Sequence, residues 1–429
     1  MLILVVLATV AYIPVLQLPF IDDDYGEIPM AASFYSTGWA PLWQDANLRA
    51  RTTNMVLNGA LDRVFGFTPL PFYVVSIVVH TICVLLVYAF GVWSGVLNER
   101  ATFWAACFFA IFEGHQEAVM WISARNESLL FLFGMAAWVC WVKYLRGGRA
   151  LWYGLAVVSL ILAAVSKESF VIFPVLMLLP CIWPPPGTSR RRALAAVIPF
   201  FAIVAVYLSW SWVGRTAQPR FGDSRFSILA PWPLVILKSW WRMMWMWGVA
   251  ALAIVAWIGG PGDRRKAWIA VVWMLLAIFP YSFLTYMPQI ASRHTYIASA
   301  GLALLIGVAA ARLWETNRRI VLGVAAAAVL VINVEIIWVK KMAQFRERAE
   351  PAVLLGEAAR EAVGPIAIHC IPFENVLTDD VLATGGSRAV YPQPVRYEDH
   401  CFEIEYQNAA GARVRIDRRV RTGKHGAFY

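Results

Sequence analysis

The segment LILVVLATVAYIPVLQLPFIDDDY (residues 2–25) joins an unbroken apolar run to three consecutive aspartates. A run of this length suits a helix inside a membrane, and the charges mark where the chain leaves the apolar phase. Like charges so close together make each other costly to ionise, so Asp22, Asp23 and Asp24 need a cation, a substrate or open water. These residues alone leave two interpretations: a solvated turn at a helix start, or an acidic functional site.

Composition indicates the protein class. Hydrophobic residues make up 60% of the 429 residues and charged residues only 15%, whereas about 25% are charged in a soluble domain. We therefore expect an all-α polytopic membrane protein, and its 21 tryptophans suit side chains at membrane interfaces. The net charge of +10 comes mainly from short loops between apolar segments, so no nucleic-acid partner is expected.

About eleven segments are predicted to cross the bilayer. They lie near residues 2–19, 70–92, 101–113, 127–145, 150–166, 169–184, 194–213, 243–260, 267–284, 295–311 and 320–339. The third is short, and Pro174 and Pro180 are expected to kink the sixth. No positively charged region precedes the first segment, so we expect it to remain as an uncleaved anchor.

Lysine and arginine accumulate in four short loops that alternate with the predicted spans. The loops contain Lys143, Arg146 and Arg149; Arg190, Arg191 and Arg192; Arg264, Arg265 and Lys266; and Arg312, Arg318 and Arg319. Basic short loops face the cytoplasm. The sequence therefore predicts a multi-pass protein of a bacterial inner membrane, with its acidic stretch and C-terminal region extracytoplasmic.

Two domains are expected. Residues 1–340 form a transmembrane domain whose first external loop, residues 20–69, is too long for a plain connector. Within this loop Glu27–Phe34 and Thr52–Phe65 carry mixed apolar and polar residues, which predicts helices along the membrane surface. Residues 341–429 are polar and form a second, extracytoplasmic domain.

Further polar motifs fall on the side predicted to be external. They are His115-Gln116-Glu117-Ala118-Val119-Met120-Trp121-Ile122-Ser123-Ala124-Arg125-Asn126-Glu127, Ser166-Lys167-Glu168, and Arg293-His294. Ionisable groups this close to apolar spans tend to face a water-filled cavity or one another. Carboxylates beside single cations suit group transfer from a phosphate-bearing donor, because cations hold phosphate and a carboxylate can deprotonate an acceptor.

These motifs, taken in order over residues 1–310, resemble the GT-C superfamily of membrane glycosyltransferases. The resemblance is to the protein O-mannosyltransferase branch that carries tetratricopeptide repeats. The acidic stretch is similar to the first-loop motif of the superfamily. The segments after His115, at Ser166 and at Arg293 look like motifs of that branch. The chain departs from the branch in three ways: no 34-residue repeat follows the last span, no proline follows His115, and Ala298 replaces the proline before Ser299.

The resemblance implies a polyprenyl-phosphate-linked sugar as donor and an acceptor hydroxyl on a protein, glycan or lipid, with hexosyl or pentosyl transfer and inversion. One of Asp22, Asp23 and Asp24 would be the catalytic base, with Asp23 weakly favoured. His115, Glu117 and Glu127 would be second acidic or polar partners, and Arg125, Lys167 and Arg293 would bind the donor phosphate. Carboxylate oxygens are compatible with a divalent metal, but no metal ligand is assigned, since His and Cys lack zinc-site spacing.

The alternative is a membrane transporter or lipid flippase. Such a protein would carry charges through the membrane depth and inverted repeats. The predicted spans are nearly free of charge at mid-depth, and no inverted repeat is visible. The enzyme interpretation is therefore preferred.

The C-terminal region, residues 341–429, is expected to be a small α/β domain. Strands are predicted at residues 366–372, 388–391 and 401–406. Cys370 and Cys401 are the two cysteines of this region. In an oxidising periplasm they could form a disulfide. The sequence does not give the distance between them, so it does not decide whether they are bonded.

Overall fold

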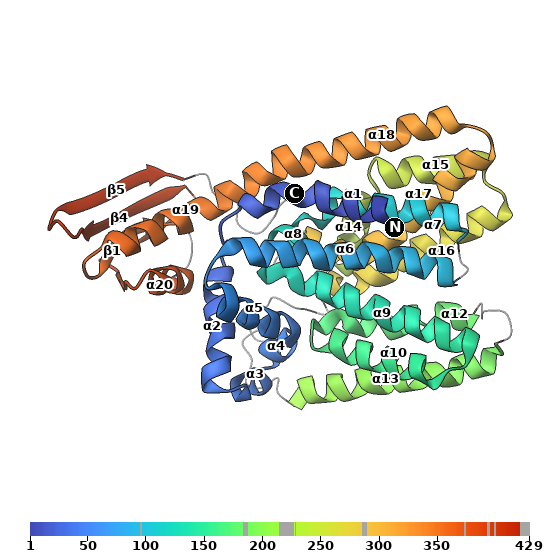
Figure 1. Ribbon diagram of the computed structural model, residues 1–429, viewed down its shortest axis with the longest axis horizontal. Helices are drawn as coiled ribbons and strands as arrows, with labels where there is room; N and C mark the ends of the chain where they lie inside the picture. The colour runs from blue at the N-terminus through green and yellow to red at the C-terminus, as the bar shows by residue number, and fades with distance from the viewer. Residues whose placement is uncertain are drawn as a thin grey trace.

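The computed structural model describes residues 1–94, 97–182, 188–213, 227, 229–284, 290–372, 375–392, 395–398 and 400–420. It combines a helical bundle with a small sheet domain at one end (Figure 1). The bundle helices are α1 (Leu2–Tyr12), α6 (Pro69–Ser94), α7 (Glu99–Ile111), α9 (Asn126–Gly147), α10 (Ala150–Ala164), α13 (Arg190–Val213), α14 (Trp232–Met244), α15 (Trp247–Ile258), α16 (Pro261–Ile278), α17 (Tyr296–Glu315) and α18 (Arg319–Glu335).

Six helices of the described chain are long and apolar enough to cross a membrane, and the bent pair α14–α15 would make a seventh. Leu2–Gln17 and Ala150–Ala164 are shorter apolar helices. The polytopic all-α class is thus confirmed. Where a kinked sixth span was expected, the short helices α11 (Ile172–Leu176) and α12 (Leu179–Ile182) stand instead, because prolines interrupt the helical hydrogen bonds there.

The predicted span at 243–260 is replaced by two helices. Met246 has a positive φ of 67°, a conformation that an α-helix does not contain. Consequently α14 and α15 meet at 79°, and Lys238 and Arg242 lie within α14.

Helix α17 forms the centre of the bundle, and nearly all of its residues are buried. It packs against α7 and α16. Gly301 permits this approach, because a Cβ there would lie 2.7 Å from the carbonyl oxygen of Ala270. Small residues at such crossings let helix backbones come together inside a membrane.

The loop at residues 20–69 forms four helices across one end of the bundle: α2 (Asp24–Thr37), α3 (Ala40–Gln44), α4 (Ala46–Arg49) and α5 (Thr52–Phe65) (Figure 1). The two helices predicted in this loop are therefore confirmed. Asp22 starts the turn into α2 with a φ of 44°, a left-handed conformation that aspartate tolerates better than most residues.

The four basic loops lie at the end of the bundle opposite α2 (Figure 1). Two of them contact each other where the Arg192 guanidinium lies 5.6 Å from the Tyr144 ring centre. The other two meet where Arg312 Nε lies 3.6 Å from an Asp263 oxygen. The grouping predicted from sequence is thus present in three dimensions.

The C-terminal region follows α18 without a break. A π-turn, Ile336–Lys341 (η9), leads directly into α19 (Met342–Glu361), so a continuous helical rod joins the bundle to the sheet. The sheet contains β1 (Ile366–Ile371), β2 (Ala389–Val390), β3 (Arg396–Tyr397), β4 (Cys401–Gln407) and β5 (Arg413–Arg419), with the helix α20 (Asn375–Thr384) after β1.

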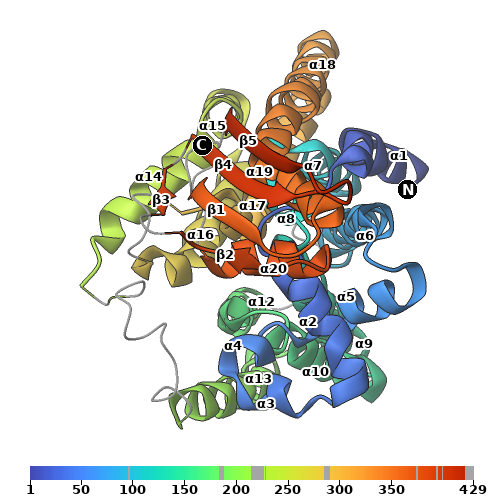
Figure 2. The same ribbon diagram turned by 90° about the vertical axis from the view of Figure 1, so that its left-hand side faces the viewer.

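The strand order is β2-β1-β4-β5, and β3 also pairs with β1 (Figure 2). β2 and β3 run parallel to β1, whereas β4 is antiparallel to β1 and β5 is antiparallel to β4. The predicted strands near 366, 388 and 401 are confirmed. β5 was not predicted, although its alternation of apolar and charged residues is typical of a strand with one exposed face. Cys370 and Cys401 form a disulfide with their Cα atoms 5.7 Å apart.

Candidate active site

The three consecutive aspartates have different environments, although sequence makes them look equivalent. Asp24 is fully buried, Asp22 is half-buried and Asp23 is exposed. The turn into α2 produces this division, because it directs neighbouring side chains to different sides of the chain. The three aspartates are therefore suited to different structural or chemical roles.

Asp24 fastens α2 to the segment between α8 (Gln116–Met120) and α9. Its Oδ1 accepts hydrogen bonds from the backbone N–H of Ser123 at 2.9 Å and from the Ser123 hydroxyl at 2.7 Å. Its Oδ2 accepts from the Ile21 N–H at 3.0 Å. Burial raises the pKa of Asp24 to about 7, although these hydrogen bonds oppose the shift.

Asp22 and Asp23 differ in their partners. Asp22 forms an ion pair with Arg348 of α19, so the C-terminal rod is attached at the acidic stretch. Asp23 is the N-cap residue of α2, yet its side chain makes no capping hydrogen bond. Within the described part of the chain, no ion pair engages the Asp23 carboxylate, which leaves it available to a ligand.

A buried carboxylate and two arginines lie around Trp121. The Arg348 and Arg293 guanidinium carbons are 4.2 Å and 5.3 Å from the centre of the Trp121 ring. Glu117 accepts from the Arg293 backbone N–H at 3.0 Å and forms an ion pair with its side chain at 3.4 Å. Burial alone would raise the pKa of Glu117, but the charges of Arg293 and Arg348 keep it below its usual value.

A second carboxylate cluster surrounds Glu127 at the start of α9. Lys167 Nζ lies 3.0 Å from Glu127 Oε1, and His294 Nδ1 lies 2.5 Å from the same oxygen. The Tyr281 hydroxyl donates to Glu127 Oε2 at 2.8 Å, and it also lies 2.5 Å from the Ser169 hydroxyl. The predicted residues Glu127 and Lys167 are thus direct partners of each other.

Arg125 lies inside the protein. Its guanidinium donates to Asn54 Oδ1, Asn58 Oδ1 and the Phe72 carbonyl oxygen, so it joins α5 to α6. It has no exposed surface. A fully buried guanidinium whose donors are engaged in this way is suited to holding the helices together.

His115 is also buried. Its Nε2 lies 2.6 Å from the Ser299 hydroxyl, and the rings of Phe109 and Tyr296 pack against it at 4.4 Å. Burial and the neighbouring His80 hold the pKa of His115 well below its usual value, which favours the neutral form.

The C-terminal domain touches the acidic helix at a second point. α20 packs on α2 (Figure 2), and a Cβ at Gly26 would lie 2.5 Å from an Asp380 oxygen. Burial raises the pKa of Asp380, and the charges of Asp379 and Asp23 add to this shift. Asp23 therefore lies close enough to the C-terminal domain for its charge to act on Asp380.

A further ion pair supports the same region from within the loop. Glu27 on α2 pairs with Arg51 at 2.6 Å. Burial raises the pKa of Glu27, and the charge of Arg51 opposes that shift. Arg51 was not assigned to the site from sequence, because only the fold reveals the acid with which it pairs.

Three of the predicted residues, Asp22, Arg293 and Glu117, are joined by short contacts. Asp22, Arg348, Trp121, Arg293 and Glu117 form one chain of contacts. Sequence analysis did not assign Arg348, and its only signal was the charged run at residues 346–348. Among the described residues, the one cluster with metal-ligand geometry is Cys370, Glu398 and Cys401, where the cysteines are disulfide-bonded.

Comparison with solved structures identifies the fold: the chain has the fold of the GT-C membrane glycosyltransferases. This confirms the resemblance at the level of the fold. The fold is similar to that of ArnT from Cupriavidus metallidurans bound to undecaprenyl phosphate, with a TM-score of 0.57 and 13% identity over 92% of this chain and 86% of that chain.

The same ArnT in its apo state gives a TM-score of 0.54 and 12% identity over the same shares of the two chains. The Archaeoglobus fulgidus oligosaccharyltransferase tethered to an acceptor peptide gives a TM-score of 0.47, from which we infer nothing. No protein-family profile and no curated protein matches the sequence.

Proposed function

We propose that the protein is a membrane glycosyltransferase that transfers a sugar from a polyprenyl-phosphate-linked donor to an acceptor hydroxyl on the extracytoplasmic side. The observation that carries this proposal is the position of Asp23. It is the exposed carboxylate of the acidic stretch, with no ion pair among the described residues, and it adjoins Asp22, which pairs with Arg348 beside Trp121 and Arg293. A base beside two cations is what such a transfer requires.

In the proposed reaction Asp23 takes the proton of the acceptor hydroxyl. The acceptor oxygen attacks the anomeric carbon as the bond from that carbon to the phosphate oxygen breaks. A single displacement of this kind inverts the anomeric configuration. The polyprenyl phosphate leaves with the electron pair of the broken bond, and Arg293 and Arg348 offset its negative charge.

The remaining predicted residues receive supporting roles. Asp24 holds α2 against Ser123, and Asp22 holds Arg348 in place. Glu117 orients Arg293, while Glu127 orients Lys167 as a second cation. Arg125 and His115, which are both fully buried, fix the helices behind the site.

The test is to incubate purified full-length protein with radiolabelled polyprenyl-phosphate sugars, both hexosyl and pentosyl, and to follow loss of the lipid-linked label. Wild type should consume at least one donor. Asp23→Asn should lose turnover by about 10²–10⁴-fold, the range for a general base. Asp62→Asn, which removes an acid from α5, is the matched control and should keep wild-type turnover.

Two results would contradict the proposal. One is a wild-type protein that consumes none of the donors although it binds polyprenyl phosphate. The other is equal turnover by wild type and Asp23→Asn. In the second case the donor class would stand, and the assignment of Asp23 as the base would be wrong.

A further inference from the structure

A basic, tryptophan-lined pocket lies at the end of the bundle opposite α2. Its cavity has a volume of about 460 Å³. The lining residues are Trp93, Lys143, Arg146, Gly147, Arg149 and Trp152. They come from the end of α6, the last turn of α9 and the start of α10. Gly148, with a φ of 67°, makes the tight turn from α9 to α10. This turn places the cations Lys143, Arg146 and Arg149 on one small surface.

These cations are not neutralised by acids. Lys143 Nζ lies 3.4 Å from the ring centre of Trp93 and 4.2 Å from that of Trp152. Aromatic rings hold an ammonium group without removing its net charge. Within the described part of the chain, no carboxylate forms an ion pair with Lys143, Arg146 or Arg149. The pocket therefore presents a net positive charge.

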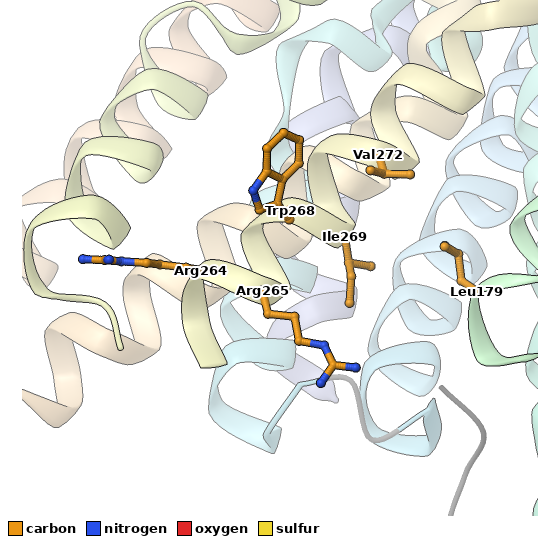
Figure 3. Close-up of a pocket in the computed structure, with 6 residues that line it drawn as sticks. All are labelled: Leu179, Arg264, Arg265, Trp268, Ile269 and Val272. Atoms are coloured by element: carbon orange, nitrogen blue, oxygen red, sulfur yellow. The ribbon is translucent and has the colours of Figure 1, made fainter. Parts of the chain in front are cut away.

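Another pocket at this end differs in the arrangement of its cations. It has a volume of about 470 Å³ and is lined by Leu179, Arg264, Arg265, Trp268, Ile269 and Val272 (Figure 3). In Figure 3 the side chains of Arg264 and Arg265 point in different directions from one helix. The Arg264 guanidinium donates to the Ala256 carbonyl oxygen. The cations of this pocket do not converge, so the pocket at Lys143 is the stronger anion site.

An apolar track leads away from the Lys143 pocket. Leu151, Leu155, Val158 and Ile161 are exposed along α10, and their spacing places them on one face of the helix. α10 has 15 residues and spans about 22 Å, less than the hydrocarbon thickness of about 30 Å. A short helix draws lipid headgroups inward toward its flanking cations.

We propose that this pocket binds the phosphate headgroup of an anionic phospholipid, whose acyl chains lie along the exposed face of α10. The cations select the negative headgroup, and the apolar track favours an amphiphile over a small anion. The proposal does not depend on the glycosyltransferase reaction, because the pocket lies at the other end of the bundle.

The test uses the full-length protein in nanodiscs that contain phosphatidylcholine with or without phosphatidylglycerol. Native mass spectrometry then counts the lipids retained after mild delipidation. The test variant is Arg146→Gln/Arg149→Gln, which changes two exposed residues. The matched control is Arg318→Gln/Arg319→Gln, which removes two charges from another loop at the same end.

Wild type and control should retain phosphatidylglycerol preferentially. The test variant should lose roughly fivefold in preference for each cation removed, or about 25-fold in total. Equal retention by test variant and wild type, or an equal loss in the control, would overturn the proposal. Displacement of the lipid by millimolar inorganic phosphate would overturn the lipid assignment and indicate a site for free phosphate instead.

Discussion

At the end of the bundle that carries α2, cations and carboxylates occur in pairs, whereas at the opposite end Lys143 rests on tryptophan rings. Paired examples are Arg348 with Asp22, Arg293 with Glu117 and Lys167 with Glu127. Pairing fixes each side chain at a defined position, and a reaction centre requires such preorganisation. Unpaired cations at a membrane surface meet negative headgroups without a fixed geometry. Under the two proposals, this difference separates a site for chemistry from a surface for membrane contact.

The largest expected contrast between the two ends is in the effect on stability of removing one charge from each. Arg125→Met should lower the free energy of unfolding by roughly 3–5 kcal/mol, because it leaves the buried acceptors of α5 and α6 unpaired. Arg146→Met, at the exposed end, should change it by less than about 0.5 kcal/mol. Thermal unfolding of the two purified variants in one detergent measures the contrast. Equal unfolding temperatures would contradict the structural role of Arg125.

The pH dependence of stability tests the buried aspartate. The pKa of Asp24 is about 7 in the folded protein and about 3.9 in the unfolded chain. Its contribution to stability is therefore fully present below about pH 4 and is lost as pH rises through about 7. The loss amounts to a few kcal/mol, at about 1.4 kcal/mol per pKa unit.

Asp24→Asn should remove this pH dependence between pH 4 and 7, whereas Asp62→Asn should keep it. Unfolding temperatures measured across that range give the comparison. An unchanged pH profile in Asp24→Asn would show that another group titrates.

A smaller effect is expected where the C-terminal rod meets the acidic stretch. Arg348→Gln removes the ion pair with Asp22 and should weaken local structure by about 1 kcal/mol, because the pair is partly exposed. Hydrogen exchange of the first turn of α2 should then accelerate roughly fivefold. Arg346→Gln on the same helix is the control, since Arg346 contacts Gln17 instead. Equal acceleration in both variants would argue against a specific link at Asp22.

Much of this organisation could be predicted from sequence, because it depends on hydrophobicity and on the distribution of charge along the chain. The apolar segments, the grouping of the basic loops and the strand at residue 366 follow from such local patterns. The order of the polar motifs also predicted the GT-C fold. These signals required no knowledge of which residues meet in space.

Burial and long-range partners could not be predicted in this way. Arg125 and Arg293 look alike as single cations in polar motifs, yet only Arg125 is fully enclosed. Arg348 is 326 residues from Asp22 along the chain, and no local pattern links them. The bend at Met246 depends on one positive φ, and a methionine in a sequence does not indicate such a conformation. The different environments of Asp22, Asp23 and Asp24 likewise arise from the turn into α2.

In the proposed reaction Asp23 performs the chemistry while Arg293 holds the donor phosphate. The most direct test measures polyprenyl-phosphate binding and donor turnover on the same samples of Asp23→Asn and Arg293→Gln. We expect Asp23→Asn to bind like wild type but to lose turnover by about 10²–10⁴-fold, whereas Arg293→Gln should lose binding. Wild-type turnover by Asp23→Asn, or wild-type binding by Arg293→Gln, would contradict this proposal.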